Sequence, residues 1–302
     1  FKIQVAVDKE KAFLKTFSHN FKDSETKNLD LGDSNILKDI PKSDIIIAGP
    51  PCQGFSITGP RNIDDPRNKL YLSVFKTLKL TNPKAFVVEN VRGLKTMWEG
   101  NVFKEIIKKF ESAGYIVTES LLNSADYGVP QIRHRVFIVG IKKELDKKFE
   151  FPKPEFDKDN YITCGEAISN LPSLENGELK TNNYNEKPTT NYQRYVMDSN
   201  KLYNHEATLH KQFVKDTIAL VPEGGNYKDL PKGVGDSRKF NEAWTRYHSK
   251  KPSRTIDTGH RNHFHYKWNR VPTIRENARL QSFKDSFEFL GTKTSQNVQV
   301  GN

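Results

Sequence analysis

The chain has 302 residues, a formal net charge of +11 and 35% hydrophobic residues, and its 19 Phe and 11 Tyr supply apolar area for a folded core. It contains no apolar run near the roughly 20 residues of a membrane span and no charged-then-apolar leader, so we expect a cytoplasmic protein. Two cysteines are too few for a disulfide framework or a cysteine-based zinc site. The positive charge favours a polyanionic partner, although a solvated lysine-rich surface would give the same balance.

Short apolar runs recur along the first half of the chain, at residues 3–7, 44–49, 85–90, 115–123 and 135–141. Amphipathic stretches such as residues 101–114 separate them. This alternation predicts an α/β fold with a buried, largely parallel sheet and crossover helices. Ligands of such sheets bind at the carboxyl ends of the strands.

The amino-acid composition changes near residue 150, where Pro, Gly, Asn and Lys become frequent and hydrophobic periodicity weakens. We expect a second domain built largely of loops, with a polar surface that suits recognition. Residues 273–283 return to helical spacing, and Thr273 and Glu276 have the spacing of a capping box.

The stretch GPPCQGFS, residues 49–56, places Cys52 where an apolar strand ends. A free thiol has a pKa of about 8.5, so a reactive one needs its thiolate stabilised by a helix start or by nearby cations. Taken alone, Cys52 is either a nucleophile or a small buried residue, and its surroundings leave both interpretations open.

Two further segments help to interpret this stretch, namely VVENVRG, residues 87–93, and QIRHRVFIVG, residues 131–140. Together they resemble the DNA (cytosine-5)-methyltransferase family, whose ordered motifs include Pro-Cys-Gln, Glu-Asn-Val and Gln-x-Arg-x-Arg. The resemblance implies a Rossmann-like, S-adenosylmethionine-dependent methyltransferase sheet with a smaller, irregular target-recognition domain. Other segments that match the family's motifs in order are residues 6–17, 31–33, 64–79, 270–283 and 299–302.

The resemblance also suggests a division into domains. We predict that residues 1–172 and 286–302 form the catalytic domain and that residues 173–285 form the target-recognition domain. The family begins with a Phe-x-Gly-x-Gly cofactor loop and continues past the tenth motif into a closing helix, and this chain shows neither. We therefore expect a fragment of a longer protein that binds the cofactor weakly by itself.

The family's chemistry assigns roles to four residues. Carbon 5 of cytosine is a poor nucleophile, so the Cys52 thiolate is expected to add to carbon 6 of a flipped-out base and thereby activate carbon 5 toward the methyl of S-adenosyl-L-methionine. Glu89, as a carboxylic acid, is expected to stabilise ring nitrogen 3. Arg135, and with less support Arg133, is expected to hold the carbonyl oxygen of the base and to orient Glu89.

The resemblance also implies cofactor contacts at five positions. Asp8 follows a strand and is expected to accept the ribose hydroxyls, and Asp33 is expected to meet the adenine amino group. Pro51 and Leu70 are expected to supply apolar contact, and Asn302 lies where the tenth motif touches the cofactor.

We expect double-stranded DNA as the partner, with residues 53–67 forming a lid over the target base. Three histidines, His260, His263 and His265, lack a fourth ligand, so we expect DNA contacts or packing in their place. A basic patch that includes Lys267 and Arg270 is expected to face phosphates. The residues expected to contact DNA are Gln53, Ser56, Arg61, Arg67, Arg254 and Arg261.

The leading hypothesis is a DNA (cytosine-5-)-methyltransferase of a restriction-modification system, acting as a nucleoid-associated monomer. A cognate restriction endonuclease would share its DNA site without direct contact. The alternatives are a transfer-RNA cytosine-5 methyltransferase and an inactive DNA-binding relative. A nicotinamide-dependent oxidoreductase would need a Gly-x-Gly-x-x-Gly turn, which the sequence does not contain. We expect Arg275 and Glu276 to be structural.

Overall fold

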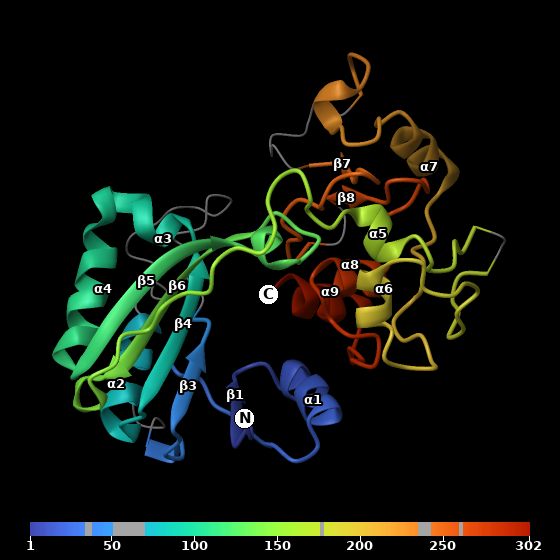
Figure 1. Ribbon diagram of the computed structural model, residues 1–302. Coiled ribbons are helices and arrows are strands. Elements are labelled where there is room, and N and C mark those ends of the chain that lie inside the picture. The colour runs from blue at the N-terminus through green and yellow to red at the C-terminus, as the bar shows by residue number, and fades with distance from the viewer. Residues whose placement is uncertain (34–37, 51–69, 176–177, 235–242, 260–261) are drawn as a thin grey trace. The chain divides into compact units, whose positions relative to one another are not determined.

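The computed structural model is shown in Figure 1. It describes residues 1–302 except 34–37, 51–69, 176–177, 235–242 and 260–261. None of the helices in these described residues has the length and apolar character of a membrane-spanning segment.

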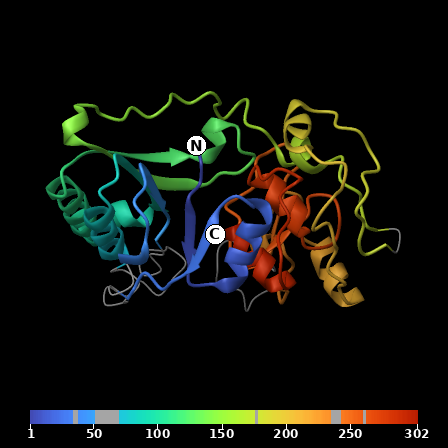
Figure 2. The same ribbon diagram turned by 90° about the horizontal axis from the view of Figure 1, so that it is seen from below.

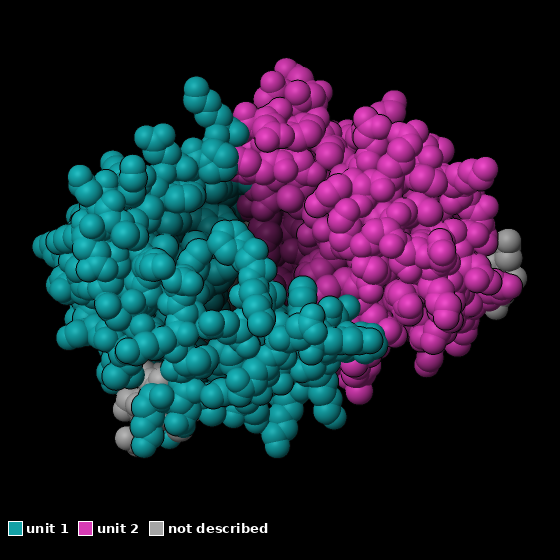
Figure 3. All heavy atoms as spheres, turned by 60° about the horizontal axis from the view of Figure 1, so that its bottom comes forward, with its two compact units in different colours: residues 1–123, 134–153 teal, residues 124–133, 154–302 magenta. Residues whose placement is uncertain are grey.

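The chain forms two compact units, distinguished by colour in Figure 3. Unit 1 comprises residues 1–123 and 134–153, and unit 2 comprises residues 124–133 and 154–302. Residues 154–172 and 286–302, which the sequence assigned to the catalytic domain, thus pack within unit 2. The functional division at residues 172 and 286 stays a prediction.

Unit 1 contains a four-stranded sheet in the order β3-β4-β6-β5. Its strands are β3 (Ile45–Ala48), β4 (Ala85–Val91), β5 (Tyr115–Asn123) and β6 (His134–Lys142). The α/β class is confirmed, and three of the four strands run in one direction, so the predicted parallel arrangement fails only at β6. β3 and β4 are parallel, whereas β6 runs antiparallel to both β4 and β5. The reason is the connection through residues 124–133, which reverses the chain after β5 without a crossover helix.

A second, two-stranded parallel sheet in unit 1 pairs β1 (Val5–Asp8) with β2 (Glu25–Asn28). Helix α1 (Lys11–Asn20) joins the two strands. The register places Asp8 opposite Asn28 at the carboxyl end of both strands. Asn28 Nδ2 donates to the carbonyl oxygens of Asp8 and Lys9, which holds the turn after β1.

Helices α2 (Leu70–Thr81) and α4 (Asn101–Ser112) cover one face of the four-stranded sheet (Figure 2). The apolar residues of α4 recur at helical spacing and pack against Phe86 of β4, whose ring lies 4.7 Å from that of Phe110. Gly140 pairs with Phe86 in the register of β4 and β6. A glycine is needed at this position because a Cβ would come within 2.1 Å of the Phe86 ring. The described part of unit 1 also contains short helices, among them α3 (Gly93–Thr96), η4 (Met97–Gly100) and η6 (Lys143–Leu145).

Side-chain alternation along β4 decides where its polar residues point. Phe86, Val88 and Asn90 are buried, whereas the residues between them are partly exposed. Glu89 therefore belongs to the sheet face opposite the one that α2 and α4 cover.

Unit 2 has little regular structure, in agreement with its loop-rich composition. Its helices lie at η5 (Ser124–Tyr127), α5 (Cys164–Ile168), α6 (Asn191–Val196), α7 (Gln212–Ala219), η7 (Tyr227–Asp229), α8 (Ile274–Leu280) and α9 (Lys293–Gly301). Two short parallel strands pair with each other, β7 (Thr245–Arg246) and β8 (His263–Phe264). The largest apolar core of unit 2 lies among α5, α6, α8 and α9.

Helix α8 is buried along its whole length. The predicted capping box is confirmed, because the Thr273 hydroxyl accepts the Glu276 N–H and the Glu276 carboxylate accepts the Thr273 N–H. A buried helix must pair its charges. Arg279 accordingly binds Asp285 at 2.6 Å, and Arg275 donates to backbone carbonyls, as the structural role predicted for Arg275 requires.

Arg270 forms a second buried ion pair, with Glu276, through contacts of 2.7 and 2.8 Å. Its residual exposure is 2%, so the prediction that Arg270 faces phosphates is wrong. The sequence cannot reveal this burial, since the partner of Arg270 becomes its neighbour only when α8 is packed.

His265 is buried beside the same pair. Its Nδ1 accepts the backbone N–H groups of Lys267 and Trp268, and its Nε2 lies 3.7 Å from Glu276. Burial lowers the pKa of His265 to about 3, although the charge of Glu276 acts in the opposite direction. Among the described residues, no group of three or more His, Cys, Asp or Glu side chains could hold a metal ion.

The neutral state of His265 predicts that unit 2 loses stability in mild acid. The unfolded chain takes up a proton near pH 6.5, whereas the folded chain takes it up only near pH 3. Between pH 7.5 and 5.5 this one group should remove about 1.4 kcal/mol of unfolding free energy. In His265→Asn, whose Oδ1 can accept the same two N–H groups, urea titrations should show a pH dependence shallower by that amount. Parallel pH curves for the two proteins would contradict this assignment.

Candidate active site

The ends of β3 and β4 lie side by side in unit 1. Asn90 Nδ2 donates to the carbonyl oxygen of Pro50 at 3.0 Å, and a Cβ added to Gly49 would lie 3.8 Å from Glu89 Oε2. The chain that leaves β3 toward Cys52 therefore starts beside Glu89. Cys52 follows Pro50 by two positions and lies outside the described residues.

Glu89 forms an ion pair with Arg135, whose Nε lies 2.8 Å from Glu89 Oε1. Arg135 Nη1 also donates to the carbonyl oxygen of His134. The two side chains meet because Arg135 pairs with Val91 in the antiparallel register of β4 and β6, diagonally across from Glu89. The structure thus brings together two of the predicted catalytic residues.

The environment of this pair is intermediate between core and solvent, with side-chain exposures of 16% for Arg135 and 35% for Glu89. Burial lowers the pKa of Arg135 while Glu89 opposes that shift, and a guanidinium stays protonated in either case. The pair places a guanidinium and an oriented carboxyl group near the carboxyl end of β4. Together these two groups could form hydrogen bonds with two different polar atoms of a ring.

Arg133 is placed differently from Arg135. Its Nη1 donates to the carbonyl of Ile256, and its Nη2 donates to the carbonyls of Gly301 and Asn302. All three acceptors belong to unit 2, as Arg133 itself does. The described contacts therefore do not join Arg133 to Glu89.

Three of the predicted cofactor residues lie in unit 1. Asp8 ends β1, where its Oδ1 accepts the Glu10 N–H at 2.7 Å, and burial raises the pKa of its carboxyl group. Asp33 closes a turn by donating its N–H to the Asp30 carbonyl. Leu70 lies against this turn, since a Cβ at Gly32 would be 3.8 Å from its Cδ2. The segment around Asp33 and the start of α2 are therefore neighbours.

The other predicted site residues are scattered. Asn302 ends the chain in unit 2, where its carbonyl accepts from Arg133. Arg254 is exposed between Ser253 and Thr255, which bond to the carbonyls of Pro130 and Ile132. The residues that lie outside the described part of the chain are Pro51, Cys52, Gln53, Ser56, Arg61, Arg67 and Arg261.

Two residues of the matched motifs had no role in the sequence-based prediction. Asn90 holds the Pro50 carbonyl, and Gln131 is fully buried, with its side chain bonded to the Ile256 N–H and the Leu280 carbonyl. Both lie inside motifs that the sequence identified, Glu-Asn-Val and Gln-x-Arg. The available signal was an amide side chain within each motif.

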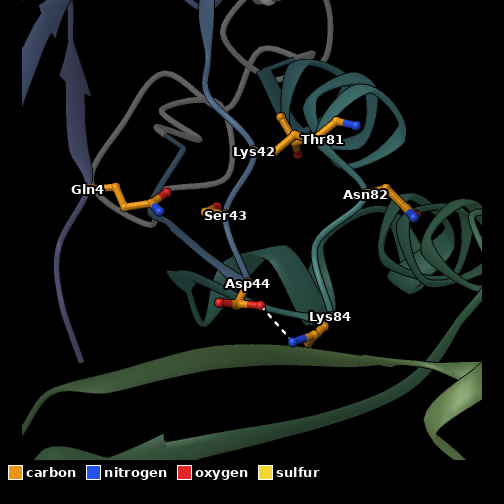
Figure 4. A pocket seen from close by; sticks show the side chains of 7 residues that line it. All are labelled: Gln4, Lys42, Ser43, Asp44, Thr81, Asn82 and Lys84. Atoms are coloured by element: carbon orange, nitrogen blue, oxygen red, sulfur yellow. Dashed lines mark ion pairs between the residues drawn. The ribbon is translucent and has the colours of Figure 1, made fainter.

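A shallow pocket of about 270 Å³ opens at the opposite end of the strands, where β3 and β4 begin (Figure 4). Its lining includes the ion pair of Asp44 and Lys84, which are 2.8 Å apart, and the side chain of Gln4. Because Glu89 lies toward the carboxyl end of β4, this pocket is separate from the candidate site.

Comparison with known proteins gives consistent results. The family model described as C-5 cytosine-specific DNA methylase matches residues 1–302. Type II methyltransferase M1.HphI of Haemophilus parahaemolyticus is 39% identical over 99% of this chain and 76% of its own length. Type II methyltransferase M.DdeI of Desulfomicrobium norvegicum is 35% identical over 99% of this chain and 79% of its own length. An E. coli prophage-encoded structure, described as a DNA modification methyltransferase, superimposes with a TM-score of 0.78 at 25% identity, covering 100% of this chain and 88% of the other.

The partly buried Glu89–Arg135 pair predicts a measurable coupling in stability. In a double-mutant cycle with Glu89→Gln and Arg135→Gln, urea denaturation should give a coupling energy of about 1 kcal/mol, because the pair is partly shielded from water. The Asp44–Lys84 pair is a matched control, since it has the same 2.8 Å separation but exposed side chains. A cycle with Asp44→Asn and Lys84→Gln should give no resolvable coupling, and equal couplings in the two cycles would refute the role of burial.

Proposed function

Since this chain belongs to the C-5 cytosine-specific DNA methylase family, we propose that it transfers a methyl group from S-adenosyl-L-methionine to carbon 5 of a cytosine in a specific double-stranded DNA sequence. The observation that carries the proposal is the Glu89–Arg135 pair beside the strand end that leads to Cys52. A thiol, a carboxyl group and a guanidinium are the groups that addition to a pyrimidine ring requires.

The residues around β1 and α2 suit an adenosine-containing cofactor. Asp8 stands at the carboxyl end of a parallel strand, and its carboxylate can accept ribose hydroxyls in addition to the Glu10 N–H. Gly32, which precedes Asp33, lies near Leu70, so Asp33 and Leu70 could offer a polar and an apolar contact to the adenine ring of the cofactor. When bound, the cofactor supplies an electrophilic methyl group. Contacts from Pro51 and Asn302 are part of the same proposal.

Cys52 acts as the nucleophile. Its thiolate sulfur bonds to carbon 6 of cytosine while the Glu89 carboxyl donates a proton to ring nitrogen 3, which moves electron density onto carbon 5. Carbon 5 would then bond to the methyl group as the methyl–sulfur bond of the sulfonium breaks, which would leave the spent cofactor as a neutral thioether. The carbon 5 proton is then lost to water, the proton on ring nitrogen 3 returns to the Glu89 carboxylate, and the bond between Cys52 and carbon 6 breaks, which restores the ring and releases the thiolate.

Arg135 orients this reaction. Its Nε holds Glu89 Oε1, so the other carboxyl oxygen can face ring nitrogen 3 of the base. The guanidinium also carries donors for the carbonyl oxygen of the base, because a planar fork can serve two acceptors at once. The positive charge further favours the thiolate form of a neighbouring cysteine.

The target base must leave the helix to reach a strand end, so the proposal includes base flipping. The net charge of +11 supports a DNA partner, and Arg254 offers an exposed guanidinium for phosphates. Gln53, Ser56, Arg61, Arg67 and Arg261 are proposed as further DNA contacts. The protein would act as a monomer at the nucleoid, and a restriction endonuclease that reads the same site would be its functional counterpart.

The two cysteines provide a matched test of the nucleophile. Cys52→Ala should abolish transfer of labelled methyl groups to duplex DNA and leave DNA binding within about threefold, because the thiol acts in the bond-forming step. Cys164→Ala should keep activity, since Cys164 is fully buried and burial raises the pKa of its thiol. Methyl transfer that survives in Cys52→Ala would refute the mechanism.

A competition experiment tests the substrate. Duplex DNA and transfer RNA offered together should show label in the DNA, and bisulfite sequencing of DNA from cells that express the protein should give one recurrent target sequence. Label in the transfer RNA would reassign the substrate, and DNA binding without any transfer would identify an inactive relative.

A further inference from the structure

The Gln-x-Arg-x-Arg motif straddles the boundary between the two units. Gln131 and Arg133 belong to unit 2, whereas Arg135 belongs to β6 of unit 1. Residues two positions apart are separated by at most about 7 Å along the chain. The motif is therefore the shortest covalent route between unit 2 and the Glu89–Arg135 pair.

The first half of the motif is firmly held within unit 2. Gln131 pairs with Ser253 in a parallel bridge, and the Ile132 N–H donates to the Ser253 carbonyl at 2.8 Å. The Gln131 side chain bonds to both the Ile256 N–H and the Leu280 carbonyl. Residues 131 and 132 are therefore bonded to the loop that carries Arg254, and a shift of that loop would shift them too.

Arg133 ends that segment and is fixed at both its main chain and its side chain. Its carbonyl accepts from the N–H and the hydroxyl of Ser124. Its guanidinium donates to three carbonyls, those of Ile256, Gly301 and Asn302, each at 3.2 Å. Gly301 is the last residue assigned to α9, and Asn302 follows it.

Residue Gly301 of α9 is itself packed against the same loop. A Cβ added to Gly301 would come within 2.3 Å of the Asp257 carbonyl oxygen, so the helix and the loop are in close backbone contact. Arg133 thus clamps three parts of unit 2 together at the point where the chain enters β6.

We propose that Arg133 is a positioning residue that couples DNA recognition by unit 2 to the reaction in unit 1. It fixes the start of β6, so the state of the recognition loops sets where Arg135 and Glu89 meet the base. In this role Arg133 acts on the base only through Arg135 and Glu89. The inference rests on the proposed function, which it deepens by adding control over specificity.

The test compares rates on two duplexes, the cognate site and a site with one base pair changed, with the full chain. Arg133→Gln should lower kcat on the cognate duplex about 10- to 100-fold, as expected when reacting groups are slightly misplaced, and should leave KM for DNA within about threefold. The rate on the altered duplex should change little, so the ratio of the two rates collapses. Arg133→Lys should recover part of the ratio, because an ammonium can reach some of the carbonyls.

Arg135→Lys is the comparison variant. Arg135 is proposed to touch the base itself, so its loss should lower both rates by the same factor. An equal loss of both rates in Arg133→Gln would overturn the positioning role in favour of direct contact. A raised KM and a lowered melting temperature with kcat retained would overturn it in favour of a purely structural role. An intact, full-length wild-type protein that methylates no DNA would instead overturn the proposed function.

Discussion

The antiparallel pairing of β6 with β4 is the constraint on which the site depends. β6 lies between β4 and β5 and bonds to both, so its first residues are placed against the end of β4. Arg135 meets Glu89 in this register, and a shift by one residue would turn it to the opposite face. On the neighbouring edge of β4, Asn90 holds Pro50 and with it the start of the segment that carries Cys52. The position of β6 beside β4 thus places the Glu89 carboxyl group, the Arg135 guanidinium and the start of the segment that leads to Cys52 at the same end of the sheet.

Buried charge organises unit 2 in the way that apolar packing organises unit 1. α8 is buried along its whole length, although it carries Arg275, Glu276 and Arg279. Such charges are costly in a core unless each is paired, and breaking a buried pair typically costs about 3 to 5 kcal/mol. Few regular elements are available to define this unit, and directional contacts such as Arg279 with Asp285 specify how its loops pack. Precise loop placement is what reading base edges in DNA requires.

The two arginines of the Gln-x-Arg-x-Arg motif are close in sequence but have different partners in the structure. Arg133 and Arg135 are two residues apart and carry the same functional group, yet Arg133 binds carbonyls of unit 2 whereas Arg135 binds a carboxylate of unit 1. A spacing of two puts side chains on one face only when both residues belong to one strand. β6 begins at His134, so the alternation does not extend to Arg133. The same short segment can therefore serve recognition at one end and chemistry at the other.

The sequence alone determined the family and located five of the strands, because apolar runs, the capping box of Thr273 and Glu276, and ordered motifs are local features of the chain. The extent of β5 was predicted to the residue, and the capping box formed as expected. Only the tertiary structure decided that β6 is antiparallel, that Arg270 is buried against Glu276, and that Arg133 faces α9. The first and the third depend on which distant segments become neighbours, and the second depends on how the chain folds over the six positions that separate Arg270 from Glu276. These outcomes follow from chain reversal, packing and the pairing of buried charges, none of which is encoded in a local pattern.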